Sequence, residues 1–426
     1  MAAATYSVLT ATDVVELHRK VQGKMLLSYN NTCEELKWHS RLSKFELAAS
    51  LREVTTPVDI RRNGGGASLV AGGYEAKPLT VAPEELTFTF IHQNFRYSFD
   101  RLSELLGRQG DASQVFDQLQ YQARKQREAM CERFSMMTYG FSSGVVCLTS
   151  TNATQSSGTY TLIDAYGKSD LDNAAYLSQF FKIGDRVALR RSGALVTNAI
   201  GTVTSVGSGT IDVTWNGSVD SDANDEVLLA NNLENTTLAG GTDHNKWHIG
   251  FLDIVETASI HGLSSSSAPL WAAGSDTTGG RFSFVKLRKG QNFIKNNSSG
   301  SPDTLVLAQG VEADTTDGLL GTNRYGSTMG MELDGSTKVK GLKVVTGTRW
   351  TPNSRAFMFD SSKLKRWEPV GQIPDESGNL PDSSNSLVIT DKLQDLSAKV
   401  TGTDHISARV ITDRASFFMW SGLQEQ

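Results

Sequence analysis

His244 and His248 are spaced as a pair of metal ligands can be. On a helix, a four-residue spacing places two imidazoles on one face, where they can bind zinc. The glutamate of a His-Glu-x-x-His motif is absent, and Asn245 and Gly250 disfavour a helix at this point. A plain surface loop is the favoured interpretation, and we expect no metal site.

The other reactive side chains form no catalytic pattern. The remaining histidines stand alone at His18, His39, His92, His261 and His405. Cys33, Cys131 and Cys147 are widely spaced and lack a Cys-x-x-Cys pair, so we expect buried, inert thiols and a reducing compartment. No Gly-x-Ser-x-Gly, Walker or dinucleotide motif is present. We therefore expect neither enzymatic activity nor a cofactor.

A glycine-rich stretch begins with two arginines, Arg61 and Arg62, followed by Asn63 and three glycines, residues 64–66. One hypothesis is a phosphate cradle, but no strand–loop–helix pattern and no Gly-Lys-Ser/Thr motif supports it. Residues 54–60 and 79–91 flank the stretch, and aromatic and β-branched residues alternate through 86–99. This alternation predicts a long β-hairpin with a flexible tip. A hairpin that projects alone is marginal in water, so we expect it to rest on a neighbour.

The longest uninterrupted helical pattern covers residues 111–139. Its apolar residues recur at steps of three, four and seven: Val115, Leu119, Ala123, Met130, Phe134 and Met137. Asp111 or Ser113 can cap the start, and Gly140 can end the helix. At ~1.5 Å per residue such a helix is about 40 Å long, and we expect the rest of the chain to be organised around it. A long core helix of an enzyme is the alternative interpretation.

The N-terminal residues 13–53 are expected to be helical. Asp13 caps one segment, and Thr32 with Glu35 fits a capping box for a second segment that continues to Leu51. Pro57 ends the pattern.

Residues 148–246 are rich in Ser, Thr, Gly and Asn. Short alternating strands are expected at 184–190, 201–206, 210–215 and 225–230, which favours a small β-barrel or sandwich inserted in the chain. Beyond it, we expect strands at 281–287, 304–307 and 341–345 and a loop at 314–330. Strands at 356–359, 387–390, 405–411 and 417–420 are expected to close a sheet.

Composition restricts the functional class. The chain has 426 residues and a formal net charge of −5, which disfavours recruitment to nucleic acid by bulk charge. The first residues lack the pattern of a secretion signal, and no run approaches the ~20 apolar residues of a membrane span.

The order of these elements resembles the major capsid protein of tailed bacteriophages, the Hong Kong ninety-seven fold. The stretches that carry the resemblance are Ile249–Val255, Gly262–Leu263, Pro269–Trp271, Pro302–Leu307, Gly341–Val345 and Ala356–Asp360 with Ser362–Leu364. The implied fold class is α+β. The implied parts are a helical N-terminal arm (1–53), an extended loop (54–92), a peripheral domain with the spine helix (93–147), an inserted barrel-like domain (148–246), an axial domain (247–345) and closing peripheral strands (346–426).

The resemblance implies a structural protein without an enzymatic step. Pentamers and hexamers of the chain would build an icosahedral shell around double-stranded DNA, as a virion component assembled in the host cytoplasm. The tip of the extended loop would supply contacts between subunits, through Arg61, Arg62, Gly64, Gly65, Gly66 and Tyr74. Expected partners are other copies of the chain, a separate scaffolding protein, a portal protein, a decoration protein and weakly held DNA, but no membrane. Lys77 lies in the loop, yet nothing marks a crosslinking partner, so we expect no covalent crosslinks.

Two alternatives remain open at this point. One is the shell protein of an encapsulin-like bacterial nanocompartment, which has the same fold. The other is a carbohydrate-binding β-protein, suggested by Trp215 and Trp247 near the β-rich block, which would need clustered exposed aromatics and a carboxylate pair.

Overall fold

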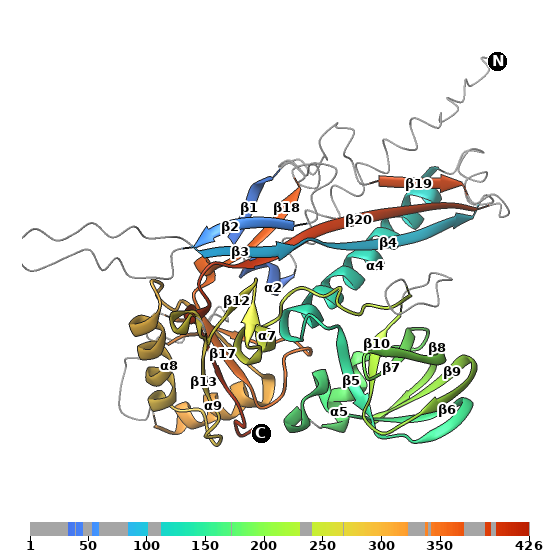
Figure 1. The fold of residues 1–426 in the computed structure, drawn as a ribbon. Coiled ribbons are helices and arrows are strands. Elements are labelled where there is room, and N and C mark those ends of the chain that lie inside the picture. Colours follow the sequence, from blue (N-terminus) through green and yellow to red (C-terminus); the bar gives the residue numbers. More distant parts are fainter. Residues whose placement is uncertain are drawn as a thin grey trace, which may run out of the picture. The chain divides into compact units, whose positions relative to one another are not determined.

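A computed structural model describes residues 33–38, 40–45, 53–58, 84–100, 112–171, 173–230, 241–266, 268–322, 337–339, 342–369, 388–392 and 398–425 (Figure 1). The chain divides into two compact units. Unit 1 comprises residues 1–52, 90–136 and 365–410, and unit 2 comprises 53–89, 137–364 and 411–426. The fold is a mixture of helices and several sheets, as the sequence predicts.

The long helix is confirmed as α4, Ala112–Tyr139. Its apolar stripe is buried at Met130, Phe134 and Met137, as expected for a helix whose one face covers a core. Gly140 follows the last helical residue, in agreement with the expected stop. Asp111 lies outside the described residues, so that part of the capping prediction stays a prediction.

Unit 1 also contains a sheet in which β1 pairs in parallel with β18, while β4 and β19 pair antiparallel with β20. The strands are β1 (Ser40–Phe45), β4 (Ile91–Asp100), β18 (Leu364–Pro369), β19 (Val388–Lys392) and β20 (Ala398–Ile411). The expected second N-terminal helix is wrong at Ser40–Phe45, which form β1; α2, Glu34–Lys37, is helical, and residues 46–51 lie outside the described part. Pairing with β18 outweighs the local capping signal, because backbone hydrogen bonds from a distant strand are invisible to local propensity.

The main sheet of unit 2 has the order β13-β21-β17-β14-β16-β15. Its strands are β13 (Gly274–Asp276), β14 (Thr304–Leu307), β15 (Thr337–Val339), β16 (Leu342–Thr346), β17 (Ala356–Phe359) and β21 (Phe417–Trp420). The sheet therefore joins strands from both sides of the expected boundary at residue 345.

Alternate residues of β17 pack into two different hydrophobic cores, one on each face of the sheet. Ala356 and Met358 belong to a cluster with residues of α8 (Phe284–Asn297) and α9 (Gln309–Thr322). Phe357 and Phe359 instead contact Phe251 of α7 (Phe251–Glu256), at centroid distances of 5.3 and 5.1 Å. The period-two burial is the expected property of a strand covered on both faces.

Two local predictions in this unit are wrong. The expected strand at 281–287 is instead the approach to α8, whose start is capped by Ser283. The expected loop at 314–330 is helical up to Thr322, in α9, and residues 323–330 lie outside the described part. Glycines at 310, 318 and 321 lower intrinsic helix propensity, but Val311 packs into the main core, and packing decides the conformation.

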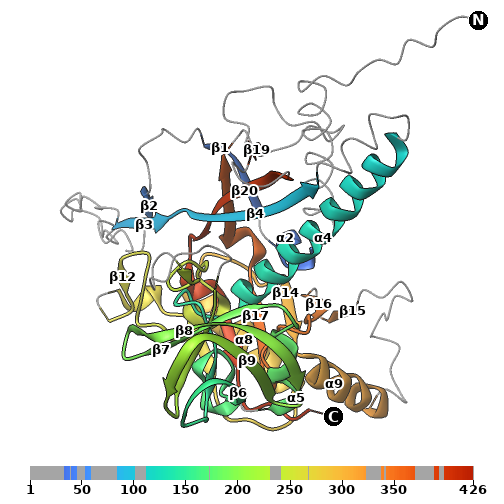
Figure 2. The same ribbon diagram turned by 90° about the vertical axis from the view of Figure 1, so that its right-hand side faces the viewer.

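The inserted β-barrel is confirmed. Its strands close in the order β10-β5-β6-β9-β8-β7 (Figures 1 and 2). They are β5 (Val145–Thr149), β6 (Ala153–Ile163), β7 (Arg186–Arg191), β8 (Ala194–Gly207), β9 (Thr210–Ser221) and β10 (Asp225–Leu229). Between β6 and β7 the chain forms short helical turns, including α5 (Ala174–Leu177).

The expected hairpin is present as β2 (Glu53–Val58) paired antiparallel with β3 (Glu84–Thr89). Pro57, expected to end a helical pattern, lies within β2. The hairpin contacts a later segment of unit 2, which contains the two-residue strands β11 (Ser259–Ile260) and β12 (Leu263–Ser264) and the turn Pro269–Trp271.

Candidate functional site

The hairpin is the candidate functional element, and its base is the part that the structure describes. Arg61, Arg62, Gly64, Gly65, Gly66 and Tyr74, together with Lys77, lie outside the described residues. Their role in contacts between subunits therefore stays a prediction. The described pairing ends at Val58 opposite Glu84, so residues 59–83 connect the two strands.

The base of the hairpin is anchored in unit 2 by buried side chains. Leu86 and Phe88 are 0% and 3% exposed. Leu86 packs with Leu263 and Trp271, and the backbone N–H of Thr87 donates to the carbonyl oxygen of His261 at 3.0 Å. Thus alternate side chains of β3 enter a core, while the intervening backbone is bonded to a second segment. Both interactions hold the base of the hairpin in unit 2.

His261 is the polar centre of this anchor. Its ring meets Phe88 edge-on at 5.9 Å, and its Nε2 accepts the backbone N–H of Ile411 at 3.3 Å. Its φ of 53° lies in the left-handed region, which is uncommon for a non-glycine residue. Burial lowers the pKa of His261 to about 4, so the ring is neutral near pH 7 and can accept through Nε2. Sequence reasoning treated His261 as an isolated histidine, because its partners are backbone groups distant in sequence.

Within unit 2, a backbone acceptor at Trp350 holds the helical turns between β6 and β7 of the barrel. The hydroxyls of Tyr166 and Tyr176 both donate to the carbonyl oxygen of Trp350, each at 2.9 Å. Phe180 lies between these rings, at 5.2 Å from Tyr166, 5.0 Å from Tyr176 and 5.4 Å from Trp350. Burial raises the pKa of Tyr176 well above its usual value, so it remains a neutral donor.

A charged cluster lies in the same connection between barrel and sheet. Arg355 is 3% exposed and pairs with Asp170 at 2.7 Å and with Glu256 at 3.7 Å. Lys168 also pairs with Glu256. Because a buried guanidinium requires a partner, these contacts favour one fixed position of the barrel on the sheet.

The chain enters and leaves the barrel at adjacent points. The N–H of Asn245 donates to the carbonyl oxygen of Ser143 at 3.1 Å. Such juxtaposed ends are the geometry of an inserted module, because the host chain can close without it. Between these two points the chain runs from about residue 144 to about 244.

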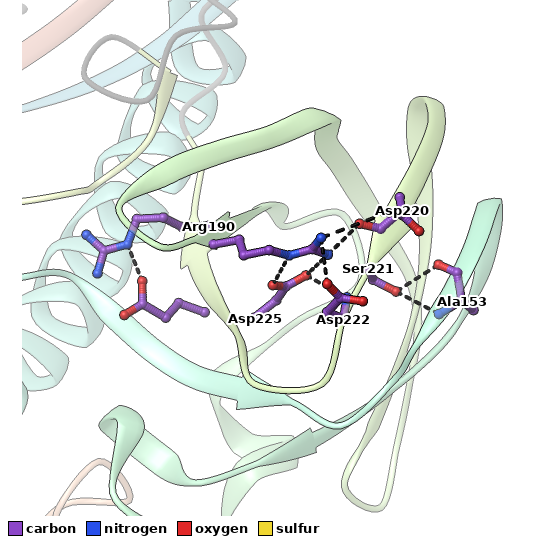
Figure 3. A network of polar contacts seen from close by, with 8 residues as sticks. Ala153, Arg190, Asp220, Ser221, Asp222 and Asp225 are labelled. Atoms are coloured by element: carbon purple, nitrogen blue, oxygen red, sulfur yellow. Dashed lines mark hydrogen bonds and ion pairs between the residues drawn. The ribbon is translucent and has the colours of Figure 1, made fainter.

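At the end of β7, Arg191 contacts the acidic segment 220–225, whose Asp220, Asp222 and Asp225 are labelled in Figure 3. Its guanidinium contacts Asp222 at 2.7 Å, Asp225 at 2.8 Å and the carbonyl oxygen of Asp220 at 2.7 Å. Ser221 bridges the same loop to Ala153, accepting its N–H at 3.3 Å and donating to its carbonyl at 2.9 Å. Arg191 thereby links the end of β7 to the segment that joins β9 to β10, and Ser221 holds the end of β9 against β6.

The histidine pair tested as a metal site does not assemble one. The Nδ1 of His244 lies 2.5 Å from a guanidinium nitrogen of Arg190, which also pairs with Glu226. Burial and then the charge of Arg190 lower the pKa of His244, while His248 is 3% exposed. Across the described ranges, no group of three or more His, Cys, Asp or Glu could hold a metal ion.

The two tryptophans that suggested a carbohydrate-binding protein are buried. Trp215 and Trp247 are 5% and 2% exposed. The indole N–H of Trp215 donates to the hydroxyl of Tyr160 at 2.8 Å inside the barrel. Side chains buried in this way cannot stack on a sugar.

Exposed apolar residues are the functional signal that the sequence did not give. Among the described residues, the exposed large hydrophobic side chains are Tyr121, Ile183, Leu270, Phe284 and Val285. Ile183 and Val285 are 73% and 78% exposed. Single exposed hydrophobics are ordinary, but Phe284 and Val285 are adjacent at the start of α8, and Leu270 neighbours the anchor residue Trp271. No helix of the described chain is long and apolar enough to cross a membrane.

Comparison with known proteins gives structural likeness only. No family model and no curated protein matches the sequence. A chain of the satellite phage P4 procapsid is 9% identical, with 94% of this chain and 99% of that chain covered, at a TM-score of 0.42. A chain of the cyanophage A-1(L) capsid is 11% identical, with 92% and 99% covered, at 0.45.

The encapsulin SrpI of Synechococcus elongatus is 9% identical, with 100% of this chain and 95% of that chain covered, at a TM-score of 0.41. Likenesses at such identities and TM-scores do not establish a shared function. By comparison, therefore, the chain is similar over most of its length to phage capsid proteins and to an encapsulin.

Proposed function

We propose that this chain is the structural subunit of a closed icosahedral shell, the major capsid protein of a tailed bacteriophage. The observation that carries the proposal is the anchored hairpin. Its base is held by Leu86, Phe88 and the Thr87–His261 hydrogen bond. The sequence then continues through 25 residues, 59–83, which include the Arg61–Arg62 pair and five glycines. A rigid base with a glycine-rich extension suits a contact that must adapt to slightly different neighbours.

The remainder of the chain is compatible with a structural role. In unit 2, charged residues of the barrel domain pair within the chain, such as Asp170 with Arg355 and Arg191 with Asp225. A subunit of this kind self-associates as pentamers and hexamers and encloses double-stranded DNA without an enzymatic step or a cofactor. Its net charge of −5 limits non-specific trapping of DNA on the wall.

Further partners belong to the same proposal. A scaffolding protein acts in trans, a portal protein occupies one vertex, and the barrel offers an outer surface for a decoration protein. Assembly takes place in the host cytoplasm, and the mature chain is part of the virion. Contacts between neighbouring subunits are made by the loop tip, residues 61–66 with Tyr74, together with exposed residues such as Val285.

Electron microscopy of the purified chain, expressed with and without its neighbouring genes, tests the proposal. We expect closed particles, or pentamers and hexamers, and uniform particles only when a scaffolding protein is co-expressed. Particles that contain a protein cargo in place of DNA would support the nanocompartment alternative. A monodisperse monomer under every condition would overturn both.

A further inference from the structure

Positive charge is concentrated on α8, Phe284–Asn297, and on the residues just before it (Figure 1). The chain as a whole is acidic, with 46 Asp and Glu against 41 Lys and Arg. Residues 277–302 contain no acidic residue and five basic ones: Arg281, Lys286, Arg288, Lys289 and Lys295. This helix therefore departs from the charge of the rest of the protein.

The packing of α8 on the main sheet fixes which of its faces meets solvent. Leu287 and Ile294 are 2% and 0% exposed and share a core with Trp420 of β21. A Cβ at Gly290 would lie 2.6 Å from the Trp420 ring, so glycine allows the helix backbone this close approach. The opposite side of the helix, here called the cationic face, consists of exposed residues: Arg288, Lys289, Asn292, Lys295 and Asn296.

The basic residues of α8 differ in whether the chain itself supplies a partner. Lys286 donates to a backbone carbonyl oxygen. Lys289 pairs with Asp276 at 3.0 Å, although its own side chain is 55% exposed. Within the part of the chain that the structure describes, the side chains of Arg288 and Lys295 have neither an ion pair nor a hydrogen bond. These two cations are thus available to an external anion.

The spacing of the two available cations fits a phosphate backbone. Arg288 and Lys295 are seven residues apart, so they lie on one side of the helix and about 10 Å apart along its axis. Duplex DNA rises about 3.4 Å for each phosphate of a strand, so the two cations match phosphates about three positions apart. Asn292 lies between them on the same side, and amide side chains also donate to phosphate oxygens.

The composition of the cationic face favours duplex DNA over a protein or a single strand. The cores of protein interfaces are depleted in lysine, whereas this face carries Lys289 and Lys295 beside Arg288. Single strands are held largely by stacking of bases on aromatic side chains, and the five residues of the face include none. The exposed apolar pair Phe284 and Val285 precedes the cations, at the start of the helix, and stays available for contacts between subunits.

We propose that the cationic face of α8 binds the phosphate backbone of duplex DNA without reading its sequence. Arg288 and Lys295 neutralise phosphates, while Asn292 and Asn296 donate hydrogen bonds to phosphate oxygens. Contacts of this kind release counterions, so the affinity falls steeply with salt. Resting on the proposed function, the ligand is the enclosed genome, and a few cations in a chain of net charge −5 hold it locally and weakly.

The experiment titrates the full chain, before particle assembly, onto a fluorescent DNA duplex of about 30 base pairs at about 50 to 200 mM salt. In Arg288→Gln/Lys295→Gln, we expect the slope of log affinity against log salt concentration to become about 1.8 shallower, since each phosphate contact contributes about 0.9. Lys182→Gln/Lys343→Gln is the matched control, because it removes the same charge at two exposed positions elsewhere in unit 2. The control should keep the wild-type slope, and an equal loss in both variants would show binding by bulk charge and overturn the proposal.

A second measurement needs no variant. Acetylation of the wild-type chain, followed by peptide mapping, should show that the duplex protects Lys295 more strongly than Lys182 or Lys343. Equal modification of the three lysines with and without the duplex would overturn the proposal.

Sedimentation and electron microscopy separate this proposal from the proposed function. If Arg288→Gln/Lys295→Gln kept the wild-type salt slope but changed the sedimentation of the chain, the face would contact protein and the DNA site would be wrong, even in a chain that forms shells. A shallower slope in a chain that never forms shells would support the DNA site and overturn the proposed function.

Discussion

His261 shows how one buried side chain can make the hairpin anchor sensitive to acid. Its neutral Nε2 accepts the N–H of Ile411, and a protonated ring would present a second donor to that N–H. The folded-state pKa of about 4 lies below the ~6.5 of an unfolded histidine. The unfolded state therefore binds the proton first, and stability is lost as the pH falls through the window from about 6.5 to about 4.

We predict that His261→Asn flattens the pH dependence of the free energy of unfolding in that window. Wild-type protein should lose up to about 3 kcal/mol between the two pH values through this group. Asparagine tolerates the positive φ of this position, so the backbone should be retained. His92, which is exposed, provides the control: His92→Asn should keep the wild-type slope. If the free energy of unfolding of His261→Asn depended on pH as steeply as that of the wild type, the loss of stability could not be assigned to His261.

The two tyrosines on the Trp350 carbonyl give a second prediction at the residue scale. Tyr166→Phe or Tyr176→Phe alone should lower the free energy of unfolding by about 1 kcal/mol, because the other hydroxyl still satisfies the acceptor. The double variant should lose more than the sum, since the buried carbonyl then has neither donor. Chemical denaturation of the four proteins measures the coupling, and strict additivity would show that the two hydroxyls act independently.

At the scale of elements, the hairpin depends on its base. We predict that Leu86→Ala lowers the free energy of unfolding by about 2–5 kcal/mol, because the side chain is fully buried against Leu263 and Trp271 and its removal leaves a cavity. Limited proteolysis should then cut β3 faster. Thr89→Ala, on the exposed side of the same strand, should change neither measurement, and equal effects from both substitutions would refute the anchor.

Comparison of the elements shows which of them could be predicted from the sequence and which could not. The 112–139 helix, the hairpin and the barrel could be predicted from the sequence. In each of them, apolar residues recur at a constant spacing over many positions. The strand Ser40–Phe45 and the helix that begins at Phe284 do not, because pairing with β18 and packing on the main core decide them. The hydrogen bonds that hold the barrel could not be predicted for another reason. Their acceptor is the backbone carbonyl of Trp350, and a backbone group has no signature in the sequence.

For the whole molecule, the question is whether the barrel is a separable module. The hydrogen bond from Asn245 to Ser143 marks where the host chain can be rejoined. Excising only residues 167–232 would remove β7 to β10 and leave β5 and β6 with no barrel partner except each other. The structure therefore places the boundaries of excision near residues 144 and 244.

We predict that replacing residues 145–243 by a short Gly-Ser linker leaves the main sheet folded but lowers its thermal midpoint. The loss arises because Trp350 and Arg355 lose the tyrosines and Asp170 that cover them. A matched variant that adds Trp350→Ser and Arg355→Ser should recover part of the midpoint, since it removes the newly exposed indole and a guanidinium that has lost Asp170. If the barrel serves only as an outer platform, both deletions should still form shells by electron microscopy. Closed particles that fail to form in both, while circular dichroism reports an intact main sheet, would instead place the barrel in the contacts between subunits.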